Sequence, residues 1–251
     1  GMPFEDRKFI RSMAEKLLFI GRGEADRMQP LTDGIKELME YLSPLVAQKV
    51  DLPVDENDLL SVLASGEKTG ALTRDEVIAD AILLLLAGHE TTINLICNGT
   101  LAFTQHPDQW KLLKEAPFQD PDTVVRATEE CLRYDPPVKS IQRIASEDVE
   151  MGGKLLKEGD RIRWFMSSAN RDPAKHENPD TFDISRWPNT HVAFGSGIHH
   201  CLGATLARME AQEAFKALAE RYDSISLETD DYEYQPSVTF RSLKSLPVSL
   251  K

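Results

Sequence analysis

Apolar side chains recur at helical spacing over the first fifty residues. Intervals of three or four residues place such side chains on one face of a helix. The positions are Phe9, Met13, Leu17 and Leu18, followed by Ile35, Leu38, Met39 and Leu42. The pattern predicts helices up to about Val50. An acidic turn at 53–58, a short helix at 59–63 and a glycine-bearing loop at 65–70 are predicted to follow.

Two further helices are predicted from their start signals. The residues Thr-Arg-Asp-Glu at 73–76 have the form of a capping box, which would open a long helix running towards Phe103. Asp-Pro at 120–121 is typical of a helix cap and first turn, and the proline pair at 136–137 would stop that helix.

After these prolines the pattern changes to short β segments. They are predicted between Val138 and Trp164, with glycine turns at 152–153 and 158–160. Residues 170–190 are rich in Pro, Asn and Asp, which predicts irregular structure.

The last part of the chain is predicted to be helical and then extended. A helix is expected from about Gly203 to Tyr222, and the tail from Ile225 to Leu250 alternates like strands. We find no internal repeat and no linker in the sequence. Residues 1–251 are therefore predicted to form a single mainly α domain with minor β structure.

Charge and cysteine content exclude several classes of protein. The chain has 29 Lys and Arg against 41 Asp and Glu, a formal net charge of −12, and no basic cluster, so nucleic acid is not expected as a partner. Cys97, Cys131 and Cys201 lie far apart without a C-x-x-C pair. This spacing argues against a disulfide framework or a four-cysteine zinc site.

The most apolar stretch, 81–107, carries Glu90 as its single formal charge. Polar residues interrupt it, and its strongest apolar core, 82–87, is too short to span a bilayer. The N-terminal residues show no signal-peptide pattern. We therefore expect a buried helix in a cytoplasmic protein that does not bind membranes.

The first candidate for chemistry is Ala-Gly-His-Glu-Thr-Thr at 87–92, within that apolar helix. A mid-helix glycine costs about 1 kcal/mol relative to alanine, and a buried carboxylate is expensive unless it is paired or functional. A water-satisfied kink in a core helix is the alternative. A zinc-protease motif is excluded because Ile93 stands where histidine is required.

The second candidate is the pair Glu130 and Arg133. Their spacing puts both side chains on one helix face, where a surface ion pair of little energetic value is the alternative.

The third candidate is Phe-Gly-Ser-Gly-Ile-His-His-Cys-Leu-Gly at 194–203, directly before a predicted helix. Its glycines permit a tight exposed loop, and the helix N-terminus would stabilise a Cys201 thiolate. The spacing fits neither a nucleophile elbow nor a dinucleotide fingerprint. Zinc held by His199, His200 and Cys201, or a buried inert Cys201, are the alternatives.

Together, in this order and spacing, the three segments resemble the cytochrome P450 family of haem-thiolate monooxygenases. Segment 194–203 is similar to the haem-binding loop, 87–92 to the oxygen-activating helix, and 130–133 to the Glu-x-x-Arg pair. The remaining similar segments are 142–145, 169–173, 182–186 and 243–248. The resemblance implies the mainly α fold of that family, with small sheets and haem b as cofactor.

The resemblance also implies roles for the residues that would hold haem. Cys201 would be the axial ligand of the haem iron, and Phe194 would shield its sulfur. Gly197 would allow close approach to the porphyrin. Arg143 and His199 would bind the propionates.

Other roles follow from the same resemblance. Glu90 and Thr91 would be the catalytic acid–alcohol pair that manages proton delivery. Glu130 and Arg133, with Arg186, would form a structural network. Substrate-facing positions would be Leu84, Ala87 and 138–141, although Lys139 is unexpectedly polar. His200 matches no family role.

Residues 1–7 resemble the start of the family's F helix, so roughly the N-terminal third of the family's length is expected to be missing. Impaired turnover, easily lost haem and self-association through the surface so exposed are expected. The implied activity inserts one oxygen atom from dioxygen into a small hydrophobic substrate, with electrons from a ferredoxin-type or flavin redox partner. A non-catalytic fragment is the alternative. Peroxide-driven oxidation or dehydration is disfavoured by the Glu90–Thr91 pair.

Overall fold

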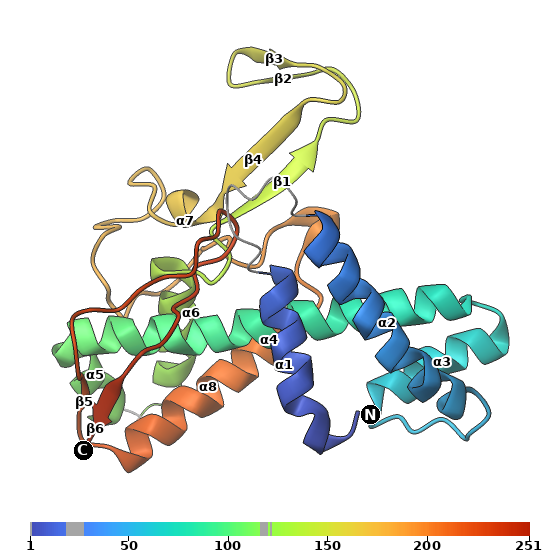
Figure 1. Ribbon diagram of the computed structural model, residues 1–251. Helices are drawn as coiled ribbons and strands as arrows, with labels where there is room; N and C mark the ends of the chain where they lie inside the picture. The colour runs from blue at the N-terminus through green and yellow to red at the C-terminus, as the bar shows by residue number, and fades with distance from the viewer. Residues whose placement is uncertain (1, 19–27, 116–119, 121) are drawn as a thin grey trace. The chain divides into compact units, whose positions relative to one another are not determined.

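The computed structural model describes residues 2–18, 28–115, 120 and 122–251 (Figure 1). The chain divides into two compact units, Gly1–Glu90 and Thr91–Lys251. Helix α4 (Arg74–Gln105) runs through the division, with Glu90 as the last residue of the first unit. That the 251 residues form a single domain stays a prediction.

The first unit is helical throughout its described regular structure. It contains η1 (Phe4–Asp6), α1 (Arg7–Leu18), α2 (Met28–Val50), α3 (Leu59–Thr69) and the first half of α4. Its apolar core is centred on Leu38, Leu42 and Val46 of α2, which are almost fully buried. The predicted helices before Val50 are confirmed as α1 and α2. Met13, Leu17, Leu38 and Leu42 of the predicted stripe lie in this core, whereas Ile35 and Met39 are exposed.

Helix α3 begins and ends at residues whose local chemistry explains its bounds. Asp58 Oδ1 accepts hydrogen bonds from the backbone N–H groups of Leu60 (2.9 Å) and Ser61 (3.2 Å). At the other end Gly70 has φ +74°, a left-handed conformation that suits a residue without Cβ. The predicted loop at 65–70 is therefore wrong up to Thr69, since the helix continues until this glycine.

The capping box of α4 is confirmed. The Thr73 backbone N–H donates to Glu76 Oε2 at 2.7 Å, and the Glu76 N–H donates to the Thr73 hydroxyl at 3.3 Å. By length and composition α4 could also cross a membrane, because its most apolar 18-residue window has a mean hydropathy of 1.3. Within the chain 22% of that window is buried.

In the residues that the structure describes, the second unit combines helices with three small sheets. Its helices are the rest of α4, α5 (Pro107–Glu115), α6 (Asp122–Tyr134), α7 (Met166–Ala169), η2 (Gly197–His199) and α8 (Ala204–Arg221). Phe103 lies at the centre of its core, with edge-on ring contacts to Trp110 (5.6 Å), Phe182 (5.4 Å) and Phe215 (5.6 Å). Helix α5 was not predicted, although Pro107 is a good first helical residue.

Each sheet consists of two antiparallel strands. The pairs are β1 (Ser140–Ile144) with β4 (Arg161–Phe165), β2 (Val149–Met151) with β3 (Lys154–Leu156), and β5 (Ile225–Leu227) with β6 (Val248–Leu250). The predicted β segments between Val138 and Trp164 are confirmed. The predicted cap at 120–121 is described only at Asp120, which accepts from the Asp122 N–H at 3.1 Å. Pro121 lies outside the described residues.

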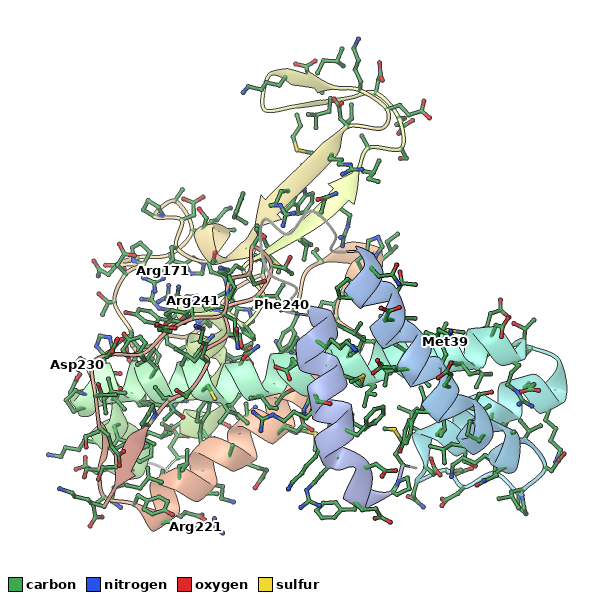
Figure 2. All side chains as sticks on the ribbon, in the orientation of Figure 1. Met39, Arg171, Arg221, Asp230, Phe240 and Arg241 are labelled. Atoms are coloured by element: carbon green, nitrogen blue, oxygen red, sulfur yellow. The ribbon has the colours of Figure 1, made fainter. Side chains whose placement is uncertain are left out.

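The tail was predicted to alternate like strands. Its ends form β5 and β6, and between them the described residues form only the isolated β-bridges Tyr234–Leu243 and Val138–Phe240. There the backbone bonds to the segment after α6: the Lys139 N–H donates to Thr239 O (2.7 Å) and the Arg241 N–H to Pro137 O (2.8 Å). The Arg241 side chain, labelled in Figure 2, pairs with Asp135 at 3.1 Å. These partners, distant in sequence, replace a regular ladder.

Asp58 provides a test of helix capping. Replacing Asp58 by Ala should lower the free energy of unfolding by about 1 kcal/mol at neutral pH, because two N–H groups of α3 lose their acceptor. Asp58→Asn keeps a capping oxygen but loses the ion pair with Lys49, so it should cost less. Urea unfolding of both variants measures the difference, and equal losses would contradict the capping role.

The same variants give a dependence on pH. Burial alone would raise the pKa of Asp58, but hydrogen bonds from Lys49 and Ser61 lower it from 3.8 to about 2. A lowered pKa means that the carboxylate stabilises the fold above pH 3.8 and loses this contribution as the pH falls through about 2. The stability gap between the parent chain and Asp58→Asn should therefore close over this window.

Candidate functional site

The loop at 194–203 folds as its glycines predicted. Gly195 and Gly197 have positive φ angles of 70° and 64°, which few other residues adopt. The loop closes on itself where the Cys201 N–H donates to Phe194 O at 2.9 Å and the His200 N–H donates to Gly197 O at 3.0 Å. Cys201 is thereby held three residues before the first residue of α8.

Cys201 is exposed, so the alternative of a buried inert thiol is wrong. Its apolar neighbours are exposed as well, with 98% of Ile198 and 88% of Leu202 accessible. A Cβ added at Gly197 would meet nothing within 4 Å. Cys131, by contrast, is buried, and burial together with the charge of Glu130 raises the pKa of its thiol.

A charged cluster that the sequence analysis missed lies behind the loop. Arg208 of α8 has its guanidinium carbon 4.4 Å from the centroid of the Phe194 ring. Glu129 binds this guanidinium through Nε (2.6 Å) and Nη2 (3.0 Å), and lies 3.0 Å from His191 Nε2. Burial would raise the pKa of Glu129, but these hydrogen bonds outweigh it and lower the pKa to about 2.

Glu130 and Arg133 form a buried ion pair, so the surface-pair alternative is wrong. Both side chains are 0% exposed. Arg133 Nε and Nη2 donate to the two carboxylate oxygens at 2.7 and 2.8 Å. Its other N–H groups donate to the carbonyls of Asn170 (3.1 Å), Pro179 (2.7 Å) and Thr181 (2.9 Å), so the guanidinium is fully hydrogen-bonded.

The carboxylate of Glu130 has further partners. It accepts from the Asp183 N–H at 2.9 Å and from Asn189 Nδ2 at 3.0 Å. Arg186 Nε lies 3.4 Å from its Oε2, while the outer nitrogens of Arg186 donate to the carbonyls of Glu177 and Asn178. The structure thus brings together Glu130, Arg133 and Arg186, as the resemblance implied.

The segment 87–92 lies within α4, which is a continuous helix from Arg74 to Gln105. Glu90 is buried and Thr91 is half-buried, whereas Ala87 and Gly88 are exposed. A Cβ at Gly88 would meet nothing within 4 Å. The two small residues therefore leave the backbone open next to the acid–alcohol pair.

Arg143 lies on β1, and the strand register decides its neighbours. Arg143 is opposite Ile162, and Ile141 is opposite Trp164. Because alternate residues share a face, these four side chains lie on the same side of the ribbon. The result is an apolar face with one cation, while His199 and His200 are exposed in the cysteine loop.

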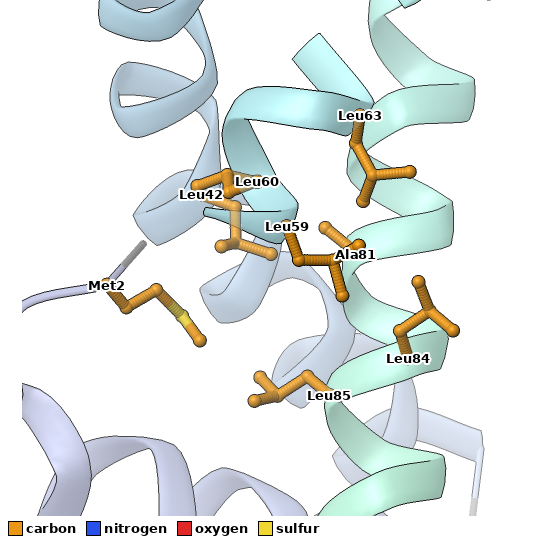
Figure 3. Close-up of a pocket in the computed structure, with 8 residues that line it drawn as sticks. All are labelled: Met2, Leu42, Leu59, Leu60, Leu63, Ala81, Leu84 and Leu85. Atoms are coloured by element: carbon orange, nitrogen blue, oxygen red, sulfur yellow. The ribbon is translucent and has the colours of Figure 1, made fainter. Parts of the chain in front are cut away.

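The positions expected to face substrate have different surroundings. Leu84 lines an apolar pocket of ≈ 150 Å³ in the first unit, which Figure 3 shows between side chains of α2, α3 and α4. Lys139 donates from Nζ to Ser237 O at 2.7 Å, so its polar side chain fixes the tail instead of standing in an apolar wall. Among the described residues, no group of three His, Cys, Asp or Glu could hold a metal ion, and the zinc alternative gains no support.

Comparison with known proteins identifies the family. The sequence model described as "Cytochrome P450" matches residues 13–244. The chain belongs to the cytochrome P450 family. Its relatives include the biotin biosynthesis cytochrome P450 of Bacillus subtilis (strain 168), which is 39% identical over 254 residues, covering 100% of this chain and 62% of the relative.

Other matches agree. The polyketide biosynthesis cytochrome P450 PksS of the same organism is 40% identical over 255 residues, covering 100% of this chain and 60% of the relative. The crystal structure of P450BioI in complex with hexadec-9Z-enoic acid ligated acyl carrier protein matches with a TM-score of 0.89 at 39% identity, covering 100% of this chain and 64% of that one. The chain spans about three fifths of the length of these relatives.

Cytochromes P450 bind haem b, a planar and largely apolar group with two carboxylates. The residues of this chain fit such a group. Cys201 offers an exposed soft sulfur ligand at a helix N-terminus, and Ile198 and Leu202 offer uncovered apolar surface. Open space beside Gly197 leaves room for a porphyrin, and Arg143 and His199 provide side chains that can pair with carboxylates.

The buried ion pair gives a stability test. Glu130→Gln should lower the free energy of unfolding by about 3 to 5 kcal/mol, because it leaves the Arg133 charge buried without a counter-ion. Urea unfolding measures this loss, with Glu213→Gln, an exposed carboxylate on α8, as the control. A loss below about 1 kcal/mol, the range of surface pairs, would contradict a structural role.

Proposed function

We propose that the protein of which this chain is part is a haem-thiolate monooxygenase. It would insert one oxygen atom from dioxygen into a small hydrophobic substrate. The observation that carries the proposal is the exposed Cys201 in its glycine loop before α8, within a chain of the cytochrome P450 family. A thiol packed inside the chain's own core, like that of Cys131, could not reach a haem iron.

The cofactor-binding residues would have three roles: to bind the iron, to leave room for the porphyrin and to bind the propionates. The Cys201 sulfur would bind the iron. The ring of Phe194, the first residue of the loop, would keep water from the sulfur. Gly197 would leave room for the porphyrin face. Arg143 and His199 would bind the propionates through charge-assisted hydrogen bonds. Arg143 lies on the apolar face of the β1–β4 pair, and His199 lies in the exposed cysteine loop.

Glu90 and Thr91 would be the catalytic residues. Bound haem supplies the activation of dioxygen, and this chain's own groups supply protons for it. The buried Glu90 carboxyl would hold a proton and the Thr91 hydroxyl would pass it on, since Ala87 and Gly88 leave the helix surface open beside them. Glu130, Arg133 and Arg186 would stabilise the fold and would not contact substrate or cofactor.

The substrate and partners are proposed by chemical class. Structures similar to this chain include one with an acyl carrier protein carrying hexadec-9Z-enoic acid and one of CYP109E1 with testosterone. A small apolar substrate is consistent with these ligands. Electrons would come from a ferredoxin-type or flavin redox partner. We also propose a cytoplasmic location, with α4 as a core helix, because buried Glu90, Asn94 and Asn98 would be costly in lipid. Self-association through the exposed apolar surface stays a prediction.

Cys201 provides the decisive test. Cys201→Ala should abolish the strongly red-shifted Soret band of the reduced carbon-monoxide complex, because the variant lacks the sulfur proposed to bind the iron. Cys97→Ala and Cys131→Ala are matched controls and should keep the band. A Cys201→Ala protein that retains the band would exclude the assignment. Absence of the band from the parent chain would favour a non-catalytic fragment.

Thr91 tests proton delivery in a protein that turns over. Thr91→Ala should keep haem and substrate binding but divert most electrons from product to hydrogen peroxide, because the hydroxyl that passes the proton is lost. The measurement is the ratio of product to NAD(P)H consumed, with Thr91→Ser as the conservative control. Normal coupling in Thr91→Ala would refute the role.

A further inference from the structure

The carboxylate of Glu129 is held by donors from two separate elements. Arg208 of α8 binds it with both Nε and Nη2, and His191 of the segment before the cysteine loop binds it with Nε2. The Glu129 side chain is 10% exposed, against 32% for Arg208. A buried carboxylate with three donors therefore fixes an arginine that would otherwise sample many rotamers.

The fixed guanidinium lies on Phe194. A planar arginine at 4.4 Å from a ring centroid is within the range of a cation–π contact, which restrains the ring and the arginine together. Lysine would not reproduce both contacts, because an ammonium does not bind a carboxylate through two fixed N–H groups and has no plane to stack on a ring. Glu129 thus reaches the Phe194 side chain through Arg208.

His191 holds the backbone on the other side of Phe194. The Ala193 N–H donates to His191 Nδ1 at 3.2 Å, so this nitrogen is an acceptor and Nε2 carries the hydrogen that is donated to Glu129. The residues directly before Phe194 are therefore tied to the same carboxylate. The carboxylate of Glu129 therefore restrains both the ring of Phe194 and the backbone next to it.

The position of Phe194 is passed on to Cys201. Phe194 O accepts the Cys201 N–H at 2.9 Å and closes the loop. We propose that Glu129 is a positioning residue, which acts through Arg208 and His191 on Phe194 and so fixes the backbone that presents the Cys201 sulfur. The effect on iron ligation rests on the proposed function, whereas the effect on the loop does not.

Hydrogen exchange tests the loop without any cofactor. Mass spectrometry of peptides covering 194–203 should show exchange faster by about tenfold or more in Glu129→Gln, because charge-assisted hydrogen bonds are lost. Arg208→Lys should show a similar increase, and the double variant should exchange no faster than the worse single variant if both act in one chain of contacts.

The matched control is Glu67→Gln in the first unit. Glu67 also binds an arginine through both Nε and Nη2, that of Arg74, so its loss removes an equivalent pair. Exchange at 194–203 should not change in this variant. Unchanged exchange in folded Arg208→Lys would overturn the proposal, and so would the same increase in Glu67→Gln. If Glu129→Gln fails to fold, Arg208→Lys still provides the test.

A second measurement concerns the ligated state. In haem-loaded protein, Glu129→Gln and Arg208→Lys should lose the red-shifted carbon-monoxide band several-fold faster on standing than the parent or Glu67→Gln. Equal decay in all four would overturn the link from Glu129 to thiolate ligation. Absence of the band from the parent would instead favour a non-catalytic fragment over the proposed function, and the exchange experiment would still decide the role of Glu129 in the loop.

Discussion

The buried ion pair of Glu130 and Arg133 is the interaction on which the rest of the second unit depends. Two charges removed from water are tolerated only when every donor and acceptor finds a partner. Here the partners are carbonyls of Asn170, Pro179 and Thr181, which belong to a segment without regular secondary structure. The pair therefore fixes a stretch of chain that has no ladder of its own.

Individual side-chain contacts connect this irregular segment and helix α6 to the cysteine loop. Asn170 donates to Leu132 O and accepts the Val192 N–H at 2.8 Å, which places the residues just before Phe194. Glu129, the neighbour of Glu130 on α6, holds Arg208 against Phe194 itself. Adjacent carboxylates on one helix thus contact the irregular segment and the loop, in which the exposed Cys201 donates its backbone N–H to Phe194 O.

Helix α4 carries the other part of the proposed chemistry under a different constraint. Its apolar residues supply cores in both units, with Ile78 and Ile82 in the first and Leu95 and Phe103 in the second. At its centre Ala87 and Gly88 are exposed beside the buried Glu90. A helix optimised for packing alone would not combine a glycine with a buried acid, which is the cost expected at a functional site.

The sequence by itself determined what depends on near neighbours: the helices of the apolar stripes, the capping box at Thr73, the glycine loop of Cys201 and the family it indicates. Only the tertiary structure decided that Glu130 and Arg133 are buried, that Glu129 binds Arg208, and that the tail bonds to residues 137–140. Glu129 and Arg208 are 79 positions apart, and such contacts leave no local periodicity. The physical reason is that burial and pairing are set by which elements meet, and no single segment encodes this.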